Sequence, residues 1–427
     1  MKPLATKYFS SFFGAVGLVA SVIFSSQAKK PAIEEPWVLI VGGNTQGYLS
    51  PCGCTKPMVG GMRRRAQATQ LLNTGPKTIF VDTGAFADNI NRQDEMKAQT
   101  MAQWLGRTHV SAVNLTERDA KLGVGNLITL QELSGSKIIS GSAEPVSGVK
   151  FSTQIQSGPF EIGGLSSRPE SVARWLGSTA IPLDDGVRRF LSNAGRWPTV
   201  LLFDGDEAEA RTLAKDNPGL KLIVYRSESD PPLMPNKQGK TWLVTPGEHG
   251  KNLVRLTFHL GEFQQYSVVK LGPEYSDEAA ATRIYRSYLK RVDEENLLLR
   301  VPRDPGYLFS GSPRCGSCHA KAETVWKSSQ HSHALATLEN EGNGRDPDCV
   351  SCHVTGLNLT TGFRDRASTP SLANVGCESC HGAGESHSVN ASLVKMPKVG
   401  EASCIGCHNV SHSPAFDFLT YWRKISH

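Results

Sequence analysis

The sequence predicts an α/β domain followed by a mainly helical and irregular C-terminal domain. Between residues 36 and 272, short apolar runs alternate with stretches of helical periodicity, which is typical of strands flanked by helices. After residue 307, aliphatic clusters become sparse and the pattern C-x-x-C-H appears four times. We call residues 36–272 the α/β part and residues 307–427 the C-terminal part.

The α/β part contains apolar runs of strand length, several of which end in glycine. We expect strands at 37–41, 78–81, 112–115, 137–139, 199–203, 222–225, 242–244 and 253–260. We expect helices at 63–72, 95–105 and 207–215. Repeated alternation of this kind favours one α/β domain.

A connecting segment, residues 273–302, is predicted to form one helix over 276–299. Ser276 or Asp277 is a suitable N-cap, and Pro302 and Pro305 follow the helix. Apolar side chains recur at helical spacing at Ala281, Ile284, Tyr285, Tyr288 and Val292. We expect this stripe to pack against one or both neighbouring parts.

The four C-x-x-C-H copies indicate covalently attached c-type haem. They are Cys315/Cys318/His319, Cys349/Cys352/His353, Cys377/Cys380/His381 and Cys404/Cys407/His408. Two thiols at this spacing can each form a thioether to one porphyrin, and the adjacent histidine then reaches the iron. The prediction is a tetrahaem cytochrome that folds around its haems, because about 120 residues with few aliphatic clusters bury little core.

Zinc and disulfides are the alternatives for these cysteines. Pairs of C-x-x-C also build zinc ribbons, but each pair here is followed directly by histidine, which makes up 12 of 427 residues. A disulfide framework would not need the histidines, and a three-residue loop is a poor disulfide site.

The iron atoms need axial ligands on both faces. The motif histidines His319, His353, His381 and His408 are the expected proximal ligands, and five further histidines lie in the C-terminal part: His331, His333, His387, His412 and His427. Five candidates for four irons favour ligation by two histidines each, which gives a closed iron of low potential. Two of the candidates, His331 and His333, lie in a predicted helix over 326–338, where their spacing turns them to opposite sides.

The N-terminus is typical of an export signal. Lys2 and Lys7 precede an apolar run at 9–24, and Ser26-Gln27-Ala28 is a suitable cleavage site, so we expect a signal peptide over 1–28 and a periplasmic protein. The alternative is an uncleaved anchor helix, for which the run is short. No later segment is expected to cross a membrane.

The α/β part resembles the calcineurin-like metallophosphoesterases of the 5'-nucleotidase type. The resemblance lies in residues 44–54, Gly60-Gly61-Met-Arg-Arg-Arg65, residues 81–85, and the later segment 220–251 with Thr245-Pro-Gly247 and His249-Gly-Lys251. It implies a β-sandwich flanked by helices and, in the family, a centre of two divalent metals.

The residues expected to hold those metals are missing. Asn44 and Gln46 stand where the family has Asp and His, Gly84-Ala85 replaces Gly-Asp, and Asn114 is followed by Leu rather than His. The later histidines are absent near Phe203-Asp-Gly205 and Tyr225-Arg-Ser227. Without these ligands little offsets cation dehydration, so we predict a degenerate domain without phosphatase activity.

Cys52 and Cys54 lie in the loop of the former active site. Thiols at this spacing could bind a soft metal, form a strained bridge, carry a reactive thiolate or simply be buried in a tight loop. Arg63-Arg-Arg65 is interpreted as a solvated helix start, with anion binding as the alternative.

The C-terminal part resembles the cytochrome c554 family of multihaem proteins. The matching pieces are Trp326 with His331-Ser-His333, residues 349–356, residues 376–384 with His387, and Ser413-Pro with Phe416, Tyr421-Trp422 and His427. The resemblance implies stacked haem pairs, periplasmic electron transfer and His331, His333, His387 and His427 as distal ligands. His412 falls outside the motif and ranks last.

The predicted function is electron transfer between redox partner proteins, with the phosphoesterase-like part as a docking module. A membrane-associated quinol-side complex is a candidate donor. In the cytochrome c554 family one haem can lack a distal ligand, so a haem oxidoreductase acting on a small nitrogen or sulfur compound is the alternative. The net charge of +6 is too mild to indicate nucleic-acid binding.

Overall fold

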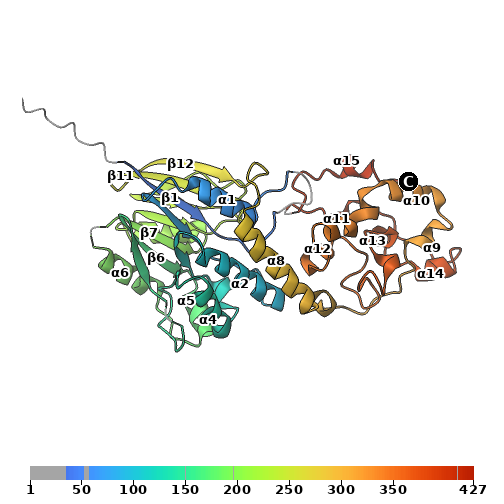
Figure 1. Cartoon of the computed structure of the whole chain (residues 1–427), viewed down its shortest axis with the longest axis horizontal. Helices are drawn as coiled ribbons and strands as arrows, with labels where there is room; N and C mark the ends of the chain where they lie inside the picture. The colour runs from blue at the N-terminus through green and yellow to red at the C-terminus, as the bar shows by residue number, and fades with distance from the viewer. Residues whose placement is uncertain (1–34, 52–56, 150, 196, 411) are drawn as a thin grey trace, which may run out of the picture. The chain divides into compact units, whose positions relative to one another are not determined.

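A computed structural model describes residues 35–51, 57–149, 151–195, 197–410 and 412–427 (Figure 1). The described residues from Pro36 onward belong to one compact unit. Cys52, Cys54 and the expected signal peptide lie outside the described residues.

The α/β part contains two six-stranded sheets. The first sheet has the order β12-β11-β1-β2-β3-β4 and the second has the order β5-β6-β7-β8-β10-β9. The strands are β1 (Trp37–Gly42), β2 (Thr78–Asp82), β3 (Val110–Asn114), β4 (Ile138–Ile139), β5 (Gln154–Ser157), β6 (Phe160–Ser166), β7 (Thr199–Asp204), β8 (Leu222–Tyr225), β9 (Asn236–Gln238), β10 (Thr241–Val244), β11 (Asn252–His259) and β12 (Glu262–Lys270). The strand β1 is parallel to β2 and antiparallel to β11, so the first sheet is mixed.

Successive side chains of β1 point to opposite faces of the first sheet, and both of these faces are buried. Leu39 and Val41 join Ile162, Val200 and residues of β8 in the core between the two sheets. Val38 and Ile40 point to the other face and join the helix-covered core. A strand buried on both faces is continuously apolar, which is why its sequence shows no polar alternation.

Helices cover the outer faces of both sheets. They are α1 (Met62–Leu72), α2 (Arg92–Gly106), α3 (Glu117–Ala120), α4 (Val124–Leu133), α5 (Pro169–Leu176), α6 (Leu183–Ala194) and α7 (Glu207–Asp216). Residues of α1, α2 and α4 pack on the first sheet, while α6 and α7 pack on the second. The predicted α/β class, a β-sandwich flanked by helices, is therefore confirmed (Figure 1).

Several elements escaped prediction because their local pattern is weak. The strand β5 is polar and lies at a sheet edge, and β6 carries two adjacent glycines. The helices α5 and α6 begin after Arg168 and Pro182, and neither has a side-chain cap. Strand partners and helix packing, rather than propensity, specify such segments.

The connecting segment forms α8 (Ala279–Glu294), followed by the 3-10 turn η1 (Leu297–Arg300). Its predicted stripe of five apolar residues is buried in the same core as α1 and α2. The helix is shorter than expected because Glu278, rather than Ser276 or Asp277, is the N-cap; its carboxylate accepts hydrogen bonds from the backbone N–H groups of Ala280 and Ala281.

Short helices and turns make up the C-terminal part, as expected. They are α9 (Ser312–Gly316), α10 (Ala320–Ser328), η2 (Gln330–His333), α11 (Ala334–Asn340), α12 (Pro347–Val350), η3 (Pro370–Leu372), α13 (Cys377–His381), α14 (Glu385–Val389), η4 (Glu401–Ser403) and α15 (Phe418–Trp422). A small apolar cluster around Leu335, Val354 and Phe363 is the core of this part. None of the described helices is long and apolar enough to cross a bilayer.

The predicted single helix over 326–338 was wrong. The chain leaves α10 at Ser329, which is extended, and enters the 3-10 turn η2 before α11 begins. Ser329 and Ser332 bond to nearby backbone carbonyl groups, which competes with a continuous α-helix. His331 and His333 consequently lie on a tight turn.

Candidate haem sites

The motif cysteines lie at or beside the short helices of the C-terminal part. Cys315 lies on α9, Cys349 on α12 and Cys377 on α13, and Cys404 directly follows η4. Within the described residues, no group of three or more His, Cys, Asp or Glu side chains could hold a metal ion, and no two motif cysteines form a disulfide.

The second cysteines of the first and fourth motifs differ from the other six in their exposure. Cys318 and Cys407 are exposed, whereas the other motif cysteines are half-buried. Cys318 follows α9 on the surface, and its sulfur lies 3.9 Å from the hydroxyl group of the neighbouring Ser317. Cys318 lies in the turn after α9, between that helix and His319. Its thioether to the first haem stays a prediction.

Three pairs of histidine rings lie at closely similar distances from each other. The ring centroids lie 6.3 Å apart in His319–His387, 6.1 Å apart in His331–His408 and 6.0 Å apart in His381–His427. A metal–imidazole bond is about 2 Å long and the ring centroid lies about 1 Å further, so two imidazoles bound to one iron have centroids about 6 Å apart. Each pair contains one motif histidine, and the spacing suits an iron between the two rings.

Hydrogen bonds at Nδ1 orient several of these rings. Nδ1 lies 2.7 Å from the carbonyl oxygen of Val394 in His387 and 3.0 Å from that of Ile425 in His427. In His353, Nδ1 lies 2.6 Å from the carbonyl oxygen of Ala334. Because a carbonyl oxygen only accepts, Nδ1 carries the proton and Nε2 keeps a free lone pair. A neutral imidazole held in this way is ready to bind a metal through Nε2.

The remaining predicted ligands occupy different surroundings. His353 is half-buried, and its Nδ1 contact fixes the ring against the start of α11. His333 is exposed at the end of η2. His412 lies beside Tyr48 of the α/β part, with ring centroids 6.2 Å apart. Among the described residues, neither His333 nor His412 stacks on a motif histidine.

Interactions between cysteines of different motifs indicate which motifs lie close together. A hydrogen bond from the thiol of Cys315 lowers the pKa of Cys377 to about 6, and a bond from Cys407 lowers the pKa of Cys352 to about 6. Burial, and secondarily the neighbouring Cys404, raises the pKa of Cys380. Neighbouring motifs therefore follow the order first, third, fourth, second along the C-terminal part.

Internal hydrogen bonds connect the α/β residues that stand where metal ligands would be expected. The side-chain amide of Asn44 donates to the carbonyl oxygens of Ser227 and Gly247, each at 2.9 Å. The amide of Gln46 donates to Oδ1 of Asn44 at 2.8 Å. Both side chains are buried. The polar groups that replace the expected ligands are thus used to join loops of the two sheets.

Arginines lie where carboxylates remain at the strand ends. Arg65 forms a buried ion pair with Asp82, and Arg226 lies 3.4 Å from Asp204. The side chain of Arg63 pairs with Asp277 at 2.6 Å and lies over the ring of Tyr285. The interpretation of residues 63–65 as a solvated helix start was wrong for Arg65, which is 4% exposed. Its guanidinium group supplies a positive charge inside the fold.

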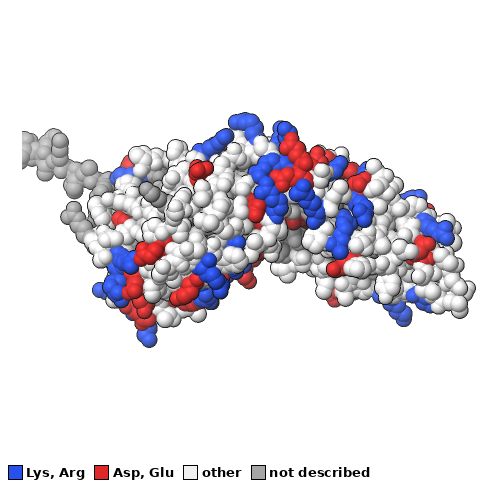
Figure 2. All heavy atoms as spheres, turned by 90° about the horizontal axis from the view of Figure 1, so that it is seen from below, with Lys and Arg blue, Asp and Glu red and all other residues white. Residues whose placement is uncertain are grey.

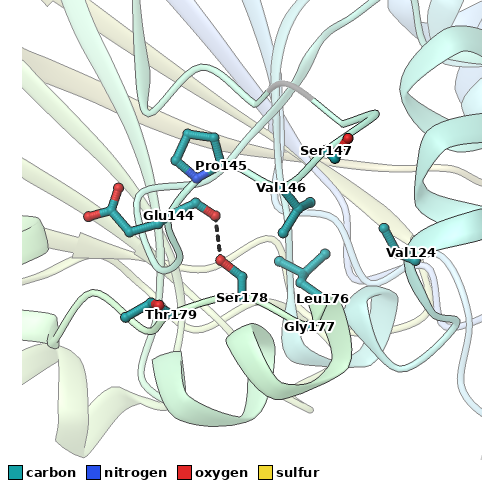
Figure 3. A pocket seen from close by; sticks show the side chains of 9 residues that line it. All are labelled: Val124, Glu144, Pro145, Val146, Ser147, Leu176, Gly177, Ser178 and Thr179. Carbon is teal, nitrogen blue, oxygen red and sulfur yellow. Dashed lines mark hydrogen bonds between the residues drawn. The ribbon is translucent and has the colours of Figure 1, made fainter.

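A surface pocket of 490 Å³ lies elsewhere on the α/β part (Figure 3). Its lining comes from the loop at Glu144–Ser147, the end of α5 with Ser178 and Thr179, and Val124. Ser178 Oγ donates to the carbonyl oxygen of Glu144 at 2.6 Å across it. None of the site residues predicted from the sequence lines this pocket.

Comparison with known proteins assigns the two parts separately. Residues 314–382 match the family described as cytochrome c554 and c-prime. The chain is 34% identical over 91 residues to cytochrome c-554 of Nitrosomonas europaea; the match covers 18% of this chain and 39% of that relative. The match therefore spans less than half of the relative's length.

The solved structures resemble the chain in fold. A 5'-nucleotidase precursor from Thermus thermophilus has a TM-score of 0.52 at 17% identity, and the match covers 72% of this chain and 68% of that structure. The Haemophilus influenzae NAD nucleotidase has a TM-score of 0.51 at 12% identity, and the match covers 69% of each chain. The chain thus carries a C-terminal region similar to cytochrome c554, joined to an α/β part with the fold of 5'-nucleotidase-type phosphoesterases.

Proposed function

We propose that this chain is a periplasmic tetrahaem c-type cytochrome that passes electrons between redox partner proteins. Cytochrome similarity over residues 314–382 supports covalent haem and electron transfer. The count of four haems rests on the four C-x-x-C-H motifs, the last of which lies beyond that region. The export signal that the sequence predicts over residues 1–28 supports a periplasmic location.

The observation that carries the proposal is the set of three histidine pairs with ring centroids 6.0–6.3 Å apart. Three motifs each contribute one ring, and the partner rings belong to His387, His427 and His331. We propose these pairs as the two axial ligands of three low-spin haems. The protein supplies ligands, burial and spacing, and the haem supplies the one-electron chemistry.

The cysteine contacts suggest a route for electrons. Motifs whose thiols are in contact would bring their porphyrin edges together, because each porphyrin is tethered through those sulfur atoms. We propose that electrons move along the order first, third, fourth, second motif. The first motif, with the exposed Cys318, and the second motif, with Cys349 and Cys352, would then lie at the two ends of the chain of haems.

The α/β part is proposed as a non-catalytic docking domain. Internal hydrogen bonds of Asn44 and Gln46, together with the Arg65–Asp82 pair, occupy the former metal centre. Figure 2 shows Lys and Arg side chains interspersed with Asp and Glu on the face in view, without a stripe of one sign. Such a surface suits a protein partner better than nucleic acid.

The haem at Cys349 and Cys352 supports a second candidate function. Its proximal histidine, His353, is held at Nδ1, and we keep His333 as its candidate distal ligand although that side chain is exposed. If His333 does not bind, the sixth position would be open to a small nitrogen or sulfur compound. The chain would then be a haem oxidoreductase as well as an electron carrier.

A redox titration followed by electron paramagnetic resonance tests both functions. Electron transfer predicts four haems, at least three of them low-spin, with several low potentials. A high-spin ferric haem that binds cyanide or nitric oxide would favour the oxidoreductase. Absence of low-spin haem would contradict the proposed ligand pairs.

A further inference from the structure

A buried carboxylate lies beside the second haem motif, and no ion pair within the described part of the chain neutralises it. Asp346 is the N-cap of α12, the short helix that carries Cys349, and it is 5% exposed. Cys349 follows it three positions later, a rise of about 5 Å along a helix. Nothing in the proposed ligand set uses this carboxylate.

Neutral donors from two other elements enclose Asp346. Gln93 of α2 donates through Nε2 to Oδ1 at 2.6 Å, and Tyr288 of α8 donates through its hydroxyl to Oδ2 at 3.0 Å. The backbone N–H of Asp348 donates to Oδ1 at 3.1 Å. Gln93 and Tyr288 also contact each other at 3.0 Å. The α/β part and the connecting helix therefore hold this carboxylate in a fixed place.

The charged groups around Asp346 do not neutralise it directly. The ammonium group of Lys97 on α2 pairs with Asp348, and Asp94 lies beside Lys97. On α8, Tyr285 donates to Asn343 at 2.8 Å rather than to Asp346. This differs from Asp82, where the guanidinium of Arg65 contacts the carboxylate. Burial, and secondarily the nearby Asp348, raises the pKa of Asp346, while the charge of Lys97 and the hydrogen bonds from Tyr288 and Gln93 oppose that rise.

We propose that Asp346 is the group that takes up a proton when the haem attached to Cys349 and Cys352 is reduced, and that Tyr288 and Gln93 position it. This inference rests on the proposed tetrahaem electron carrier. One electron from the redox partner converts ferric to ferrous iron, and one proton from solvent converts the Asp346 carboxylate to the carboxylic acid. The loss of positive charge at the iron makes the protonated form more favourable.

The α/β part then does more than dock a partner. Through Gln93, and together with Tyr288 of the connecting helix α8, it holds the group that sets how one haem potential responds to pH. A carboxylate beside this haem attachment segment would stabilise the ferric state, so that potential should fall as pH rises and Asp346 ionises. The steepest possible dependence of this potential on pH is about 59 mV per pH unit. That is the shift of a one-electron potential for a tenfold change in proton concentration.

The test is potentiometry of the full-length holoprotein between pH 5 and pH 9, with haem content and far-ultraviolet circular dichroism as checks. In the wild type, one of the four potentials should fall with pH. Asp346→Asn should hold that potential at its low-pH value throughout. Tyr288→Phe removes a donor to the ionised carboxylate, so it should move the same pH response to higher pH.

Glu339→Gln is the matched control, because it removes a carboxylate charge at an exposed position of the same part. It should leave the pH response unchanged. Infrared difference spectra on reduction should also show a protonated carboxyl band that Asp346→Asn removes. A full haem complement with four pH-independent potentials, or an unchanged response in Asp346→Asn and Tyr288→Phe, would overturn this inference alone. Missing haem would instead contradict the proposed function.

Discussion

The two parts of this chain are stabilised in different ways. In the α/β part, apolar residues from two sheets and their helices form three extended cores. In the C-terminal part, one small apolar cluster lies among the motif cysteines and three closely spaced pairs of imidazoles. The first part buries its own side chains, whereas we propose that the second is arranged around haem. The comparison teaches that a fold can be specified by residues that bind a cofactor as well as by the periodic spacing of apolar residues.

The largest predicted effect comes from withholding haem. Replacing the eight motif cysteines by alanine should leave residues 307–427 unfolded, because their own apolar cluster is too small to offset the entropy of ordering the chain. Limited proteolysis with mass spectrometry should recover the α/β part with α8 and lose the rest. If the C-terminal part resists proteolysis without haem, the claim that the two parts are stabilised in different ways is contradicted.

Removing one distal histidine should affect one haem completely and the fold slightly. His387→Ala, His427→Ala and His331→Ala should each convert one low-spin haem to high-spin, since each deletes one ring of a facing pair. Electron paramagnetic resonance measures the change. His412→Ala is the control and should leave all spin states unchanged; a high-spin haem in that variant would show that the pairs are assigned wrongly.

The next largest effect, on stability, comes from the buried guanidinium group of Arg65 in the α/β part. Arg65→Met strands the buried carboxylate of Asp82 and should cost about 3–5 kcal/mol of unfolding free energy. Arg188→Met breaks an exposed pair with Asp185 and should cost at most about 1 kcal/mol. Urea denaturation monitored by far-ultraviolet circular dichroism compares them. Equal losses would show that the Arg65 charge has no special role.

The smallest effect is a pH dependence of the α/β part. Burial raises the pKa of Asp119 to about 6, although Thr116 and the N–H groups of Ala85 and Phe86 bond to its carboxylate. Its folded pKa exceeds its ordinary value of 3.8, so its stabilising contribution is present at low pH and is lost as pH rises through about 6.

The advantage of the wild type over Asp119→Asn should therefore shrink between pH 4 and pH 7, by up to about 3 kcal/mol for a shift of roughly two pKa units. Urea denaturation at each pH measures this difference. A difference that stays constant or grows with pH would contradict a raised pKa for Asp119.

Local sequence pattern was enough for some features and not for others. The apolar runs predicted β1, β2 and β7, and the stripe from Ala281 to Val292 predicted the buried face of α8, because burial on a regular element leaves a periodic trace. The haem motifs were readable because attachment chemistry fixes the spacing of Cys and His. The same spacing carries no information on burial, so the exposure of Cys318 could not be predicted from it.

Features that depend on residues far apart in the chain could not be predicted from the sequence. The pairing of His381 with His427, and of His408 with His331, joins segments far apart in the sequence. The hydrogen bonds from Gln93 and Tyr288 to Asp346 cross from the α/β part and α8 to α12. Each residue is ordinary in its local context, and only tertiary packing brings it to its partner.

The most direct test of the tetrahaem assignment is the intact mass of the exported, purified protein, followed by mapping of haem-bearing peptides. The expected mass is that of the mature chain plus four covalent haems, with thioethers at the cysteine pairs 315/318, 349/352, 377/380 and 404/407. A chain that carries no added tetrapyrrole, or that holds zinc at these cysteines, would contradict it.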